Sequence, residues 1–254
     1  MKRRKAGIGI FVIVLIITAV RVKSMDSHRI SGRILAENIA GPGMLRLVEQ
    51  SMQARIRKAS VAEIAVKERK HPQAALTFDD GPDIRYTPLL LDGLKERNVR
   101  VSFFLLGEKV EQYPELVERM QKEGHLVGNH TYHHVQLNKL NETKAREEIL
   151  KTNNLIYETT GVYPLYLRPP FGAWKKNLEL CVEMLPVFWT IDTLDWKVQN
   201  TEKIVRTVQE KIEDGAIILM HDEYDTSVEA ALQVVDELKN QGYELVTVDQ
   251  LILP

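Results

Sequence analysis

The 254-residue chain has a single cysteine, Cys181, so an intramolecular disulfide framework is excluded. No cysteine-centred motif surrounds this residue, and we expect a buried apolar thiol there instead of a nucleophile. Internal repeats and low-complexity tracts are also absent. With 44% hydrophobic and 27% charged residues, the composition is typical of one globular domain with an appendage and excludes a disordered protein.

The body of the chain lacks positive charge, although the overall net charge is only -1. Six of the 34 Lys and Arg residues lie in the first 25 positions, which hold no acid, so the remainder carries 28 basic against 35 acidic residues, a net charge of -7. An acidic surface repels phosphate backbones. We therefore expect no nucleic-acid partner.

No apolar run reaches the roughly 20 residues that cross a bilayer comfortably. The longest, residues 6–20, spans about 15 residues and follows four basic ones, which is the layout of a secretory signal. Ser24 offers only a weak cleavage site, and Arg21 and Lys23 can snorkel. We interpret residues 1–24 as a signal-anchor, or a signal peptide if cleaved. The basic start predicts that the body is exported and held at the cell membrane facing the wall, or secreted after cleavage.

Two regions follow this segment. Residues 25–70 are polar, with apolar residues at three- and four-residue spacings, and predict a stalk or packing helix without chemistry of its own. Residues 71–254 alternate short apolar runs with amphipathic stretches, the pattern of strand–helix units in an α/β fold. Strands are expected to begin at Ala74, Val101, His125, Leu165, Pro186, Ala216 and Glu244, and helices to span residues 114–123, 143–159, 201–213 and 227–241. Seven units favour a barrel over an open sheet.

Polar clusters follow five of these strands: Asp79 with Asp80, then "HTYHH", "RPPFG", "DTLDW" and "HDE". In such barrels the chemistry lies on the loops after the strands. Five clusters at one presumed rim are hard to explain as solvated loops. The sequence therefore predicts a functional site at the carboxyl end of the barrel.

The stretch "LTFDDGP" places two carboxylates side by side where a strand ends. Neighbouring side chains in a strand point to opposite faces, so one carboxylate can bind a cation and the other a proton, although a simple polar turn would use the same residues. His130 and His134 are spaced to share one side of a helical turn, which suits two metal ligands. A carboxylate from Asp79 or Asp80 would complete a set typical of catalytic zinc, with His133 as a bystander facing away.

In this order, "TFDDGP", "HTYHH", "RPPFG", "DTLDW" and "LMH" resemble the five motifs of the polysaccharide deacetylases, carbohydrate esterase family 4, which share the NodB homology domain. The resemblance covers residues 74–253. It implies a deformed (β/α) barrel of about seven strands and a divalent metal, usually zinc, with cobalt or nickel as substitutes. It leaves the first seventy residues without a counterpart.

The resemblance also implies roles for individual residues. Asp80 would join His130 and His134 on the metal, while Asp79 would be the general base and Arg168 would pair with it. The resemblance further implies His221 as the general acid held by Asp195, the backbone N–H of Phe171 as an oxyanion donor, Gly172 as a point of close substrate approach, and Trp196 and Leu219 as walls of the acetyl pocket.

The implied reaction is hydrolysis of the N-acetyl group of N-acetylglucosamine residues in a glycan, with release of acetate. Export and the basic N-terminus favour bacterial cell-wall peptidoglycan as the substrate. "TFDDGP" resembles the branch that acts on N-acetylglucosamine more than the branch that acts on muramic acid. Chitin oligosaccharides and poly-N-acetylglucosamine stay open as substrates, as do an amidohydrolase of a small non-sugar amide and a catalytically silent glycan-binding module.

Overall fold

The computed structural model describes residues 71–174 and 184–252, which belong to a compact unit running from Val66 to Pro254. The expected anchor, the stalk through residue 70 and Cys181 lie outside the described residues. Within the described ranges, no helix is long and apolar enough to cross a membrane. The membrane expectation for residues 6–20 therefore stays a prediction.

The centre of the fold is β1 (Gln73–Asp79), the segment that opens the first motif. It pairs in parallel with β2 (Ser102–Leu105) on one side and β7 (Ala216–His221) on the other, and its first residues also pair with β8 (Glu244–Leu245). Side chains on both faces of β1 are buried, which explains why this strand reads as a nearly continuous apolar run.

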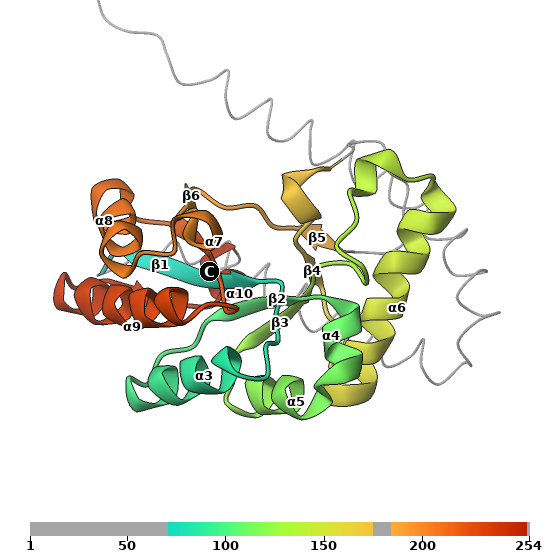
Figure 1. Cartoon of the computed structure of the whole chain (residues 1–254), viewed down its shortest axis with the longest axis horizontal. Helices are drawn as coiled ribbons and strands as arrows, with labels where there is room; N and C mark the ends of the chain where they lie inside the picture. Colours follow the sequence, from blue (N-terminus) through green and yellow to red (C-terminus); the bar gives the residue numbers. More distant parts are fainter. Residues whose placement is uncertain (1–70, 175–183, 253–254) are drawn as a thin grey trace, which may run out of the picture. The chain divides into compact units, whose positions relative to one another are not determined.

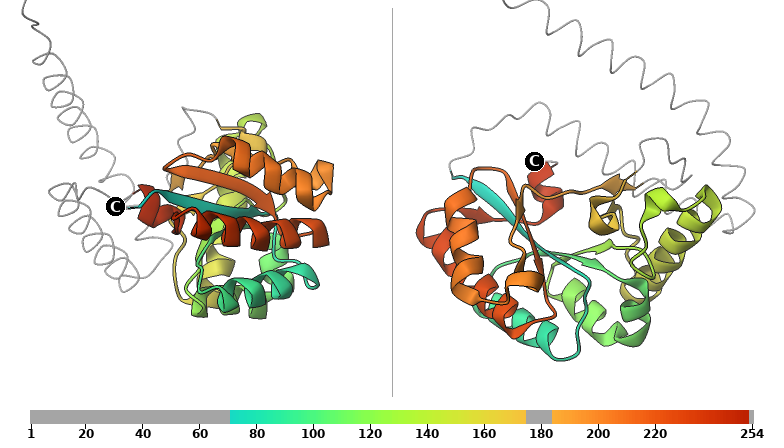
Figure 2. Two further views of the ribbon diagram at one scale, coloured as in Figure 1. Left: turned by 90° about the vertical axis from the view of Figure 1, so that its left-hand side faces the viewer. Right: turned by 45° about the horizontal axis from the view of Figure 1, so that its top comes forward.

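The strands form one curled parallel sheet, visible in Figure 1 and from two further directions in Figure 2. Seven strands follow one another in the order β5–β4–β3–β2–β1–β7–β6, with β8 added beside β1. The remaining members of the row are β3 (Leu126–Asn129), β4 (Tyr166–Leu167), β5 (Leu185–Pro186) and β6 (Ile191–Asp192). No ladder among the described residues joins β5 to β6, so the row stays open between these two strands. A curled row of seven parallel strands that does not close is a deformed barrel, and the predicted fold of about seven strands is therefore confirmed.

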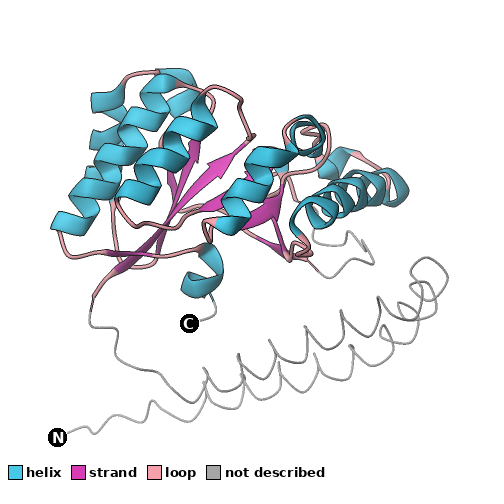
Figure 3. Ribbon diagram, turned by 90° about the horizontal axis from the view of Figure 1, so that it is seen from below, coloured by secondary structure: helices cyan, strands magenta, loops and turns pink. Residues whose placement is uncertain are grey.

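Helices cover the outside of the strands (Figure 3). Helices α5, α8 and α9 are amphipathic and bury their apolar residues, and α9 packs against both α3 and α8. The helices are α3 (Tyr86–Glu96), α4 (Gly107–Gln112), α5 (Pro114–Lys122), α6 (Glu142–Thr160), α7 (Asp195–Val198), α8 (Thr201–Lys211), α9 (Asp225–Asn240) and α10 (Val248–Ile252), with short 3-10 turns η1 (Leu137–Lys139) and η2 (Pro170–Gly172). The four helices expected from the sequence correspond to α5, α6, α8 and α9.

The single strand expected from Pro186 is wrong. The segment forms β5 and β6, which lie at opposite ends of the row. Val187 still donates its N–H to Leu167 in β4 at 2.8 Å, whereas Thr190 donates to Ile217 in β7 at 2.9 Å. Residues 187–190 therefore bridge the open side of the sheet, a path that an apolar run alone does not distinguish from a strand.

Candidate active site

The carboxyl ends of β1, β3, β4, β6 and β7 each lead into one of the five motifs, so parallel pairing gathers these motifs at one rim. Among the predicted site residues, close contacts join Asp79, Asp80, His130, Arg168, His134, Asp195 and His221 into one cluster.

Asp80 lies between two imidazoles at this rim. Its Oδ1 atom is 3.4 Å from Nε2 of His130 and 3.4 Å from Nε2 of His134. This oxygen is buried and has no hydrogen-bond partner among the described residues. Two ligands bound at about 2.0–2.1 Å to a tetrahedral zinc lie about 3.3 Å apart, close to both distances. The three side chains therefore fit a divalent cation, which would satisfy the otherwise orphaned oxygen.

The loop that carries both histidines is not helical, so the helical turn expected from the sequence is wrong. Residues 130–136 contain no helix, and Thr131 and His134 adopt positive φ angles of 67° and 55°. The two rings nevertheless approach each other, with centroids 5.0 Å apart. Left-handed backbone, and not an i,i+4 helical spacing, brings the ligands together.

His130 is held in one orientation by the neighbouring strand end. Its Nδ1 atom lies 2.6 Å from the carbonyl oxygen of Arg168, to which a protonated Nδ1 donates. Burial lowers the pKa of His130 to about 3, so the ring is neutral at pH 7. Together these effects leave the Nε2 lone pair directed to Asp80 and His134, as a metal ligand requires.

Arg168 also reaches Asp79 through its side chain. Its Nη1 donates hydrogen bonds of 2.7 Å to Asp79 Oδ1 and to the hydroxyl of Thr77, and all three side chains are buried. The guanidinium carbon lies 4.2 Å from the centre of the Phe104 ring. Burial raises the pKa of Asp79, while the charges of Arg168 and His221 oppose that rise. A base whose pKa is shifted toward neutrality is better matched to accepting a proton at physiological pH.

A second charged pair joins β7 to α7. Asp195 Oδ1 lies 2.8 Å from His221 Nδ1, and Asp195 Oδ2 accepts the backbone N–H of His221 at 2.7 Å and the hydroxyl of Ser227 at 2.8 Å. Burial alone would lower the pKa of His221, but the hydrogen bond and charge of Asp195 outweigh it and raise the pKa to about 9. His221 is therefore protonated at neutral pH, with Nε2 3.9 Å from Asp80 Oδ2.

Phe171 and Gly172 are the last two residues of η2, which begins two positions after Arg168, and they have positive φ angles of 59° and 64°. The Phe171 side chain is 62% exposed, and its ring centroid lies 4.5 Å from that of His134. A Cβ at Gly172 would approach the Trp189 ring to 3.3 Å, so both its φ angle and this neighbour favour glycine.

The two predicted pocket walls differ in exposure. Trp196 is 49% exposed on α7, whereas Leu219 is 5% exposed within β7. Leu219 also accepts a 2.8 Å hydrogen bond from the Thr193 hydroxyl through its backbone oxygen. Trp196 therefore has surface available for a ligand, while Leu219 mainly packs beneath the rim.

Sequence reasoning missed two residues that support the charged pairs. Thr77 points to the same face of β1 as Asp79, since side chains in a strand alternate, and this period could have identified it. Ser227 lies in the first turn of α9, six positions after His221, and no local pattern links it to Asp195. The Thr77 hydroxyl accepts a hydrogen bond from Arg168, and the Ser227 hydroxyl donates one to Asp195, so each residue holds one charged side chain in place.

The fold and this rim define the class: an α/β barrel with a two-histidine, one-aspartate candidate metal centre beside two charged residue pairs. The family model described as polysaccharide deacetylase matches residues 66–187. A peptidoglycan-N-acetylglucosamine deacetylase of Bacillus cereus is 40% identical over 70% of this chain and 68% of its own length. The chain belongs to the polysaccharide deacetylase family.

Two further relatives of this chain are named for different sugars. Peptidoglycan-N-acetylglucosamine deacetylase PgdA of Listeria monocytogenes is 42% identical over 73% of this chain, which spans only 40% of the PgdA length. Peptidoglycan-N-acetylmuramic acid deacetylase PdaC of Bacillus subtilis is also 42% identical, over 70% of this chain and 38% of PdaC. The structure of PdaC superposes with a TM-score of 0.70 at 41% identity, covering 72% of this chain and 91% of that structure.

A solved Bacillus anthracis protein, BA3943, is described as a pseudoenzyme of the same family. It is 29% identical with a TM-score of 0.68, covering 72% of this chain and 66% of that structure. Family fold alone is therefore not evidence of catalysis.

Proposed function

We propose that this protein is a metal-dependent N-deacetylase of peptidoglycan that removes the acetyl group from N-acetylglucosamine residues. The observation that carries the proposal is the convergence at one rim of a three-residue ligand set, a buried carboxylate and a protonated histidine. A silent glycan-binding module has no use for this combination, and the set is intact here although a relative is described as a pseudoenzyme.

Asp80, His130 and His134 would hold a divalent cation, zinc first, with cobalt or nickel as alternatives. When bound, such a cation polarises a carbonyl oxygen and lowers the pKa of water toward about 7. The protein residues around this position carry out the remaining steps.

Asp79 accepts the proton of the water that attacks the acetyl carbonyl, and Arg168 fixes the direction of the accepting oxygen. The backbone N–H of Phe171 donates to the oxygen that becomes negative as the carbonyl carbon turns tetrahedral. His221, protonated because Asp195 faces its Nδ1, then gives the Nε2 proton to the amide nitrogen as the C–N bond breaks. The products are acetate and a free amine on the sugar.

The sugar preference rests on "TFDDGP", which resembles the N-acetylglucosamine branch of the family. Percentage identity does not separate the two sugars, because PgdA and PdaC are equally similar to this chain. Trp196 and Phe171 offer exposed aromatic faces for pyranose C–H groups, and Gly172 and Leu219 border the same rim. Chitin oligosaccharides, poly-N-acetylglucosamine and a small non-sugar amide are the alternative substrates.

We also propose that residues 1–24 anchor the protein in the cell membrane, with residues 25–70 as a stalk and residues 71–254 as the deacetylase domain facing the wall. The basic flank and apolar run of the first 24 residues support this arrangement.

The activity is tested by incubating the purified full chain with Zn²⁺ and peptidoglycan sacculi, chitin oligosaccharides, poly-N-acetylglucosamine and a small cyclic amide. Acetate release from sacculi, with mass spectrometry placing the loss on N-acetylglucosamine, is the expected result. Loss from muramic acid would overturn the sugar assignment, and hydrolysis of the cyclic amide alone would overturn the glycan assignment. Absence of acetate from every substrate, with metal bound, would favour the binding module.

A further inference from the structure

Glu148, on α6, joins that helix to the loop between the two histidine ligands. Its Oε2 accepts the backbone N–H groups of Tyr132 at 3.0 Å and His133 at 2.9 Å, and its Oε1 lies 2.8 Å from Nδ1 of His133. The Glu148 side chain is only 16% exposed. One carboxylate thus makes three contacts with two consecutive residues.

These contacts fall at the most constrained part of the loop. Tyr132 and His133 lie between His130 and His134, and the backbone is left-handed at Thr131 and again at His134. This conformation costs free energy at non-glycine residues, and it persists only where the surrounding contacts impose it. Without the Glu148 carboxylate, nothing on the α6 side of the loop would bind the two central N–H groups among the described contacts.

The opposite side of the loop is anchored through its carbonyl groups. Gly107 and Glu108, at the start of α4, donate their N–H groups to the carbonyl oxygens of Thr131 and Tyr132 at 2.9 and 3.3 Å. The loop is therefore held between α4, which binds its acceptors, and Glu148, which binds its donors. A shift on either side would change the separation of the ligand atoms on His130 and His134.

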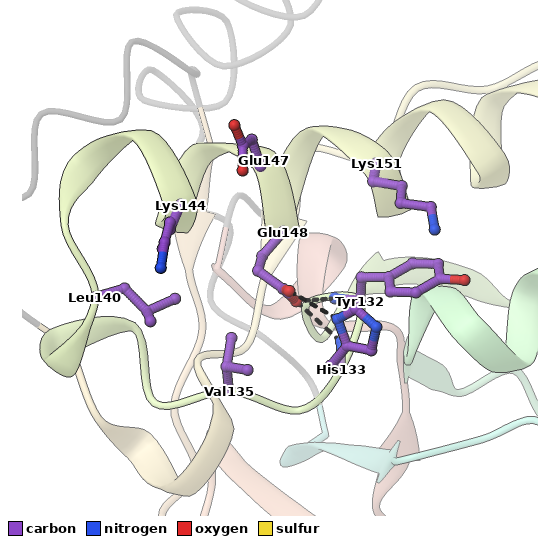
Figure 4. Close-up of a pocket in the computed structure, with 8 residues that line it drawn as sticks. All are labelled: Tyr132, His133, Val135, Leu140, Lys144, Glu147, Glu148 and Lys151. Atoms are coloured by element: carbon purple, nitrogen blue, oxygen red, sulfur yellow. Dashed lines mark hydrogen bonds and ion pairs between the residues drawn. The ribbon is translucent and has the colours of Figure 1, made fainter.

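A pocket of about 320 Å³ borders this contact, and the dashed lines in Figure 4 mark the contacts of the Glu148 carboxylate with the loop. The pocket is lined by Tyr132, His133, Val135, Leu140, Lys144, Glu147, Glu148 and Lys151, and includes no metal ligand. The His133 side chain is 59% exposed and faces away from the ligand cluster. It contacts the same Glu148 carboxylate that binds the loop. Lys151 lies over the Tyr132 ring, 3.4 Å from its centre.

We propose that Glu148 is a positioning residue for the metal centre: its carboxylate sets the HTYHH loop so that His130 and His134 converge with Asp80. The inference deepens the proposed function and rests on its metal site. Supporting residues of this kind act through the ligands, and their loss typically weakens metal affinity about 10- to 100-fold. A carboxylate that merely attaches α6 to the barrel would change stability without changing affinity.

The test compares the full chain with Glu148→Ala, Glu148→Gln and the matched control Glu147→Ala. Glu147 is the neighbouring residue of α6, lines the same pocket, and makes no hydrogen bond to the loop among the described contacts. Zn²⁺ affinity is measured by competition with a chromophoric chelator, and thermal unfolding is followed on the metal-free proteins. Glu148→Ala is expected to weaken Zn²⁺ binding about 10- to 100-fold, and Glu147→Ala to stay within about twofold of the parent.

Glu148→Gln keeps one acceptor oxygen for the two N–H groups, so its loss of affinity is expected to be smaller than that of Glu148→Ala. It also provides the measurement if Glu148→Ala does not fold. The positioning role would be overturned if the folded Glu148 variants bound Zn²⁺ as tightly as the parent while their unfolding temperature was lowered. A parent chain that binds no Zn²⁺ at all would instead overturn the proposed metal centre.

Discussion

Asp79 and Asp80 are consecutive in the chain, yet their carboxylates contact different partners. Asp79 Oδ1 accepts a 2.7 Å hydrogen bond from Arg168, whereas Asp80 Oδ1 lies 3.4 Å from the Nε2 atoms of both ligand histidines. Asp79 is the last residue of β1, and Asp80 leaves the strand with a φ of 70°. The end of one strand therefore supplies, side by side, the proposed general base and a proposed metal ligand.

This division predicts opposite effects on metal content. Asp80→Ala should lose most bound Zn²⁺, with partial recovery of activity at excess metal, because it removes a ligand. Asp79→Asn should keep metal near the parental level while activity falls about 10²-fold or more, since general base catalysis typically contributes 10² to 10⁴. Elemental analysis of both purified variants decides the matter, and an empty Asp79→Asn beside a full Asp80→Ala would exchange the two roles.

The buried pair of Arg168 and Asp79 predicts a large cost for removing one partner. Arg168→Met should lower the free energy of unfolding by about 3–5 kcal/mol, because it leaves the buried Asp79 carboxylate without its charged partner. Urea denaturation at pH 7 measures the loss.

The exposed pair of Lys95 and Glu123 is the control for this measurement. The Lys95 side chain is 69% exposed, so Lys95→Ala should cost at most about 1 kcal/mol. Adding Asp79→Leu to Arg168→Met should restore part of the lost stability. Similar costs for Arg168→Met and Lys95→Ala would contradict the assigned burial of the pair.

The sequence was sufficient to predict the rim, because polar residues stood directly after apolar runs and parallel strands bring such points together. It was insufficient for the backbone that shapes the rim. Positive φ angles occur at Asp80, Thr131, His134, Phe171 and Leu194, four of the five motifs having at least one. Local preference at non-glycine residues opposes this conformation, and contacts from distant elements impose it. The helical turn predicted for "HTYHH" was wrong for this reason.

Long-range support was equally hidden. Glu148 lies 16 positions after Tyr132, and only the packing of α6 reveals their contact. The balance at Asp79 also needs coordinates, because burial raises the pKa of this carboxyl while the charge of Arg168 lowers it. An apolar run such as residues 186–191 contains no sign that it leaves one end of the sheet for the other.

The anchor proposed for the first 24 residues gives a prediction about location. In the producing cell, most of the protein should sediment with membranes and be released by detergent but not by high salt, because an apolar segment holds it. A variant that starts at Met25 behind a cleavable export signal should be recovered outside the membrane. Recovery of the parent mainly in the extracellular fraction, beginning near Met25, would show cleavage instead.

The contact of His221 with Asp195 predicts the alkaline behaviour of the enzyme. Activity should fall as the pH rises toward about 9, the pKa of His221, because the ring then lacks the proton it donates. Asp195→Asn removes the main group that raises this pKa, so the alkaline limb should move toward or below about 6.5, the ordinary histidine value. The limbs of a pH–rate profile belong to a coupled system, so His221 is also titrated directly by NMR in the metal-free protein.

The same pair gives a stability measurement with a defined sign. Since the folded pKa of His221 lies above its unfolded value, the pair stabilises the fold fully below about pH 6.5, and this contribution is lost as the pH rises through about 9. The difference is on the order of 3 kcal/mol, at 1.36 kcal/mol per pH unit. Urea denaturation of the metal-free parent should show this decline, and Asp195→Asn should lack it.

His221→Ala should keep its bound Zn²⁺ while activity falls strongly, because a general acid is not a ligand. Metal loss from that variant would contradict the role proposed for His221.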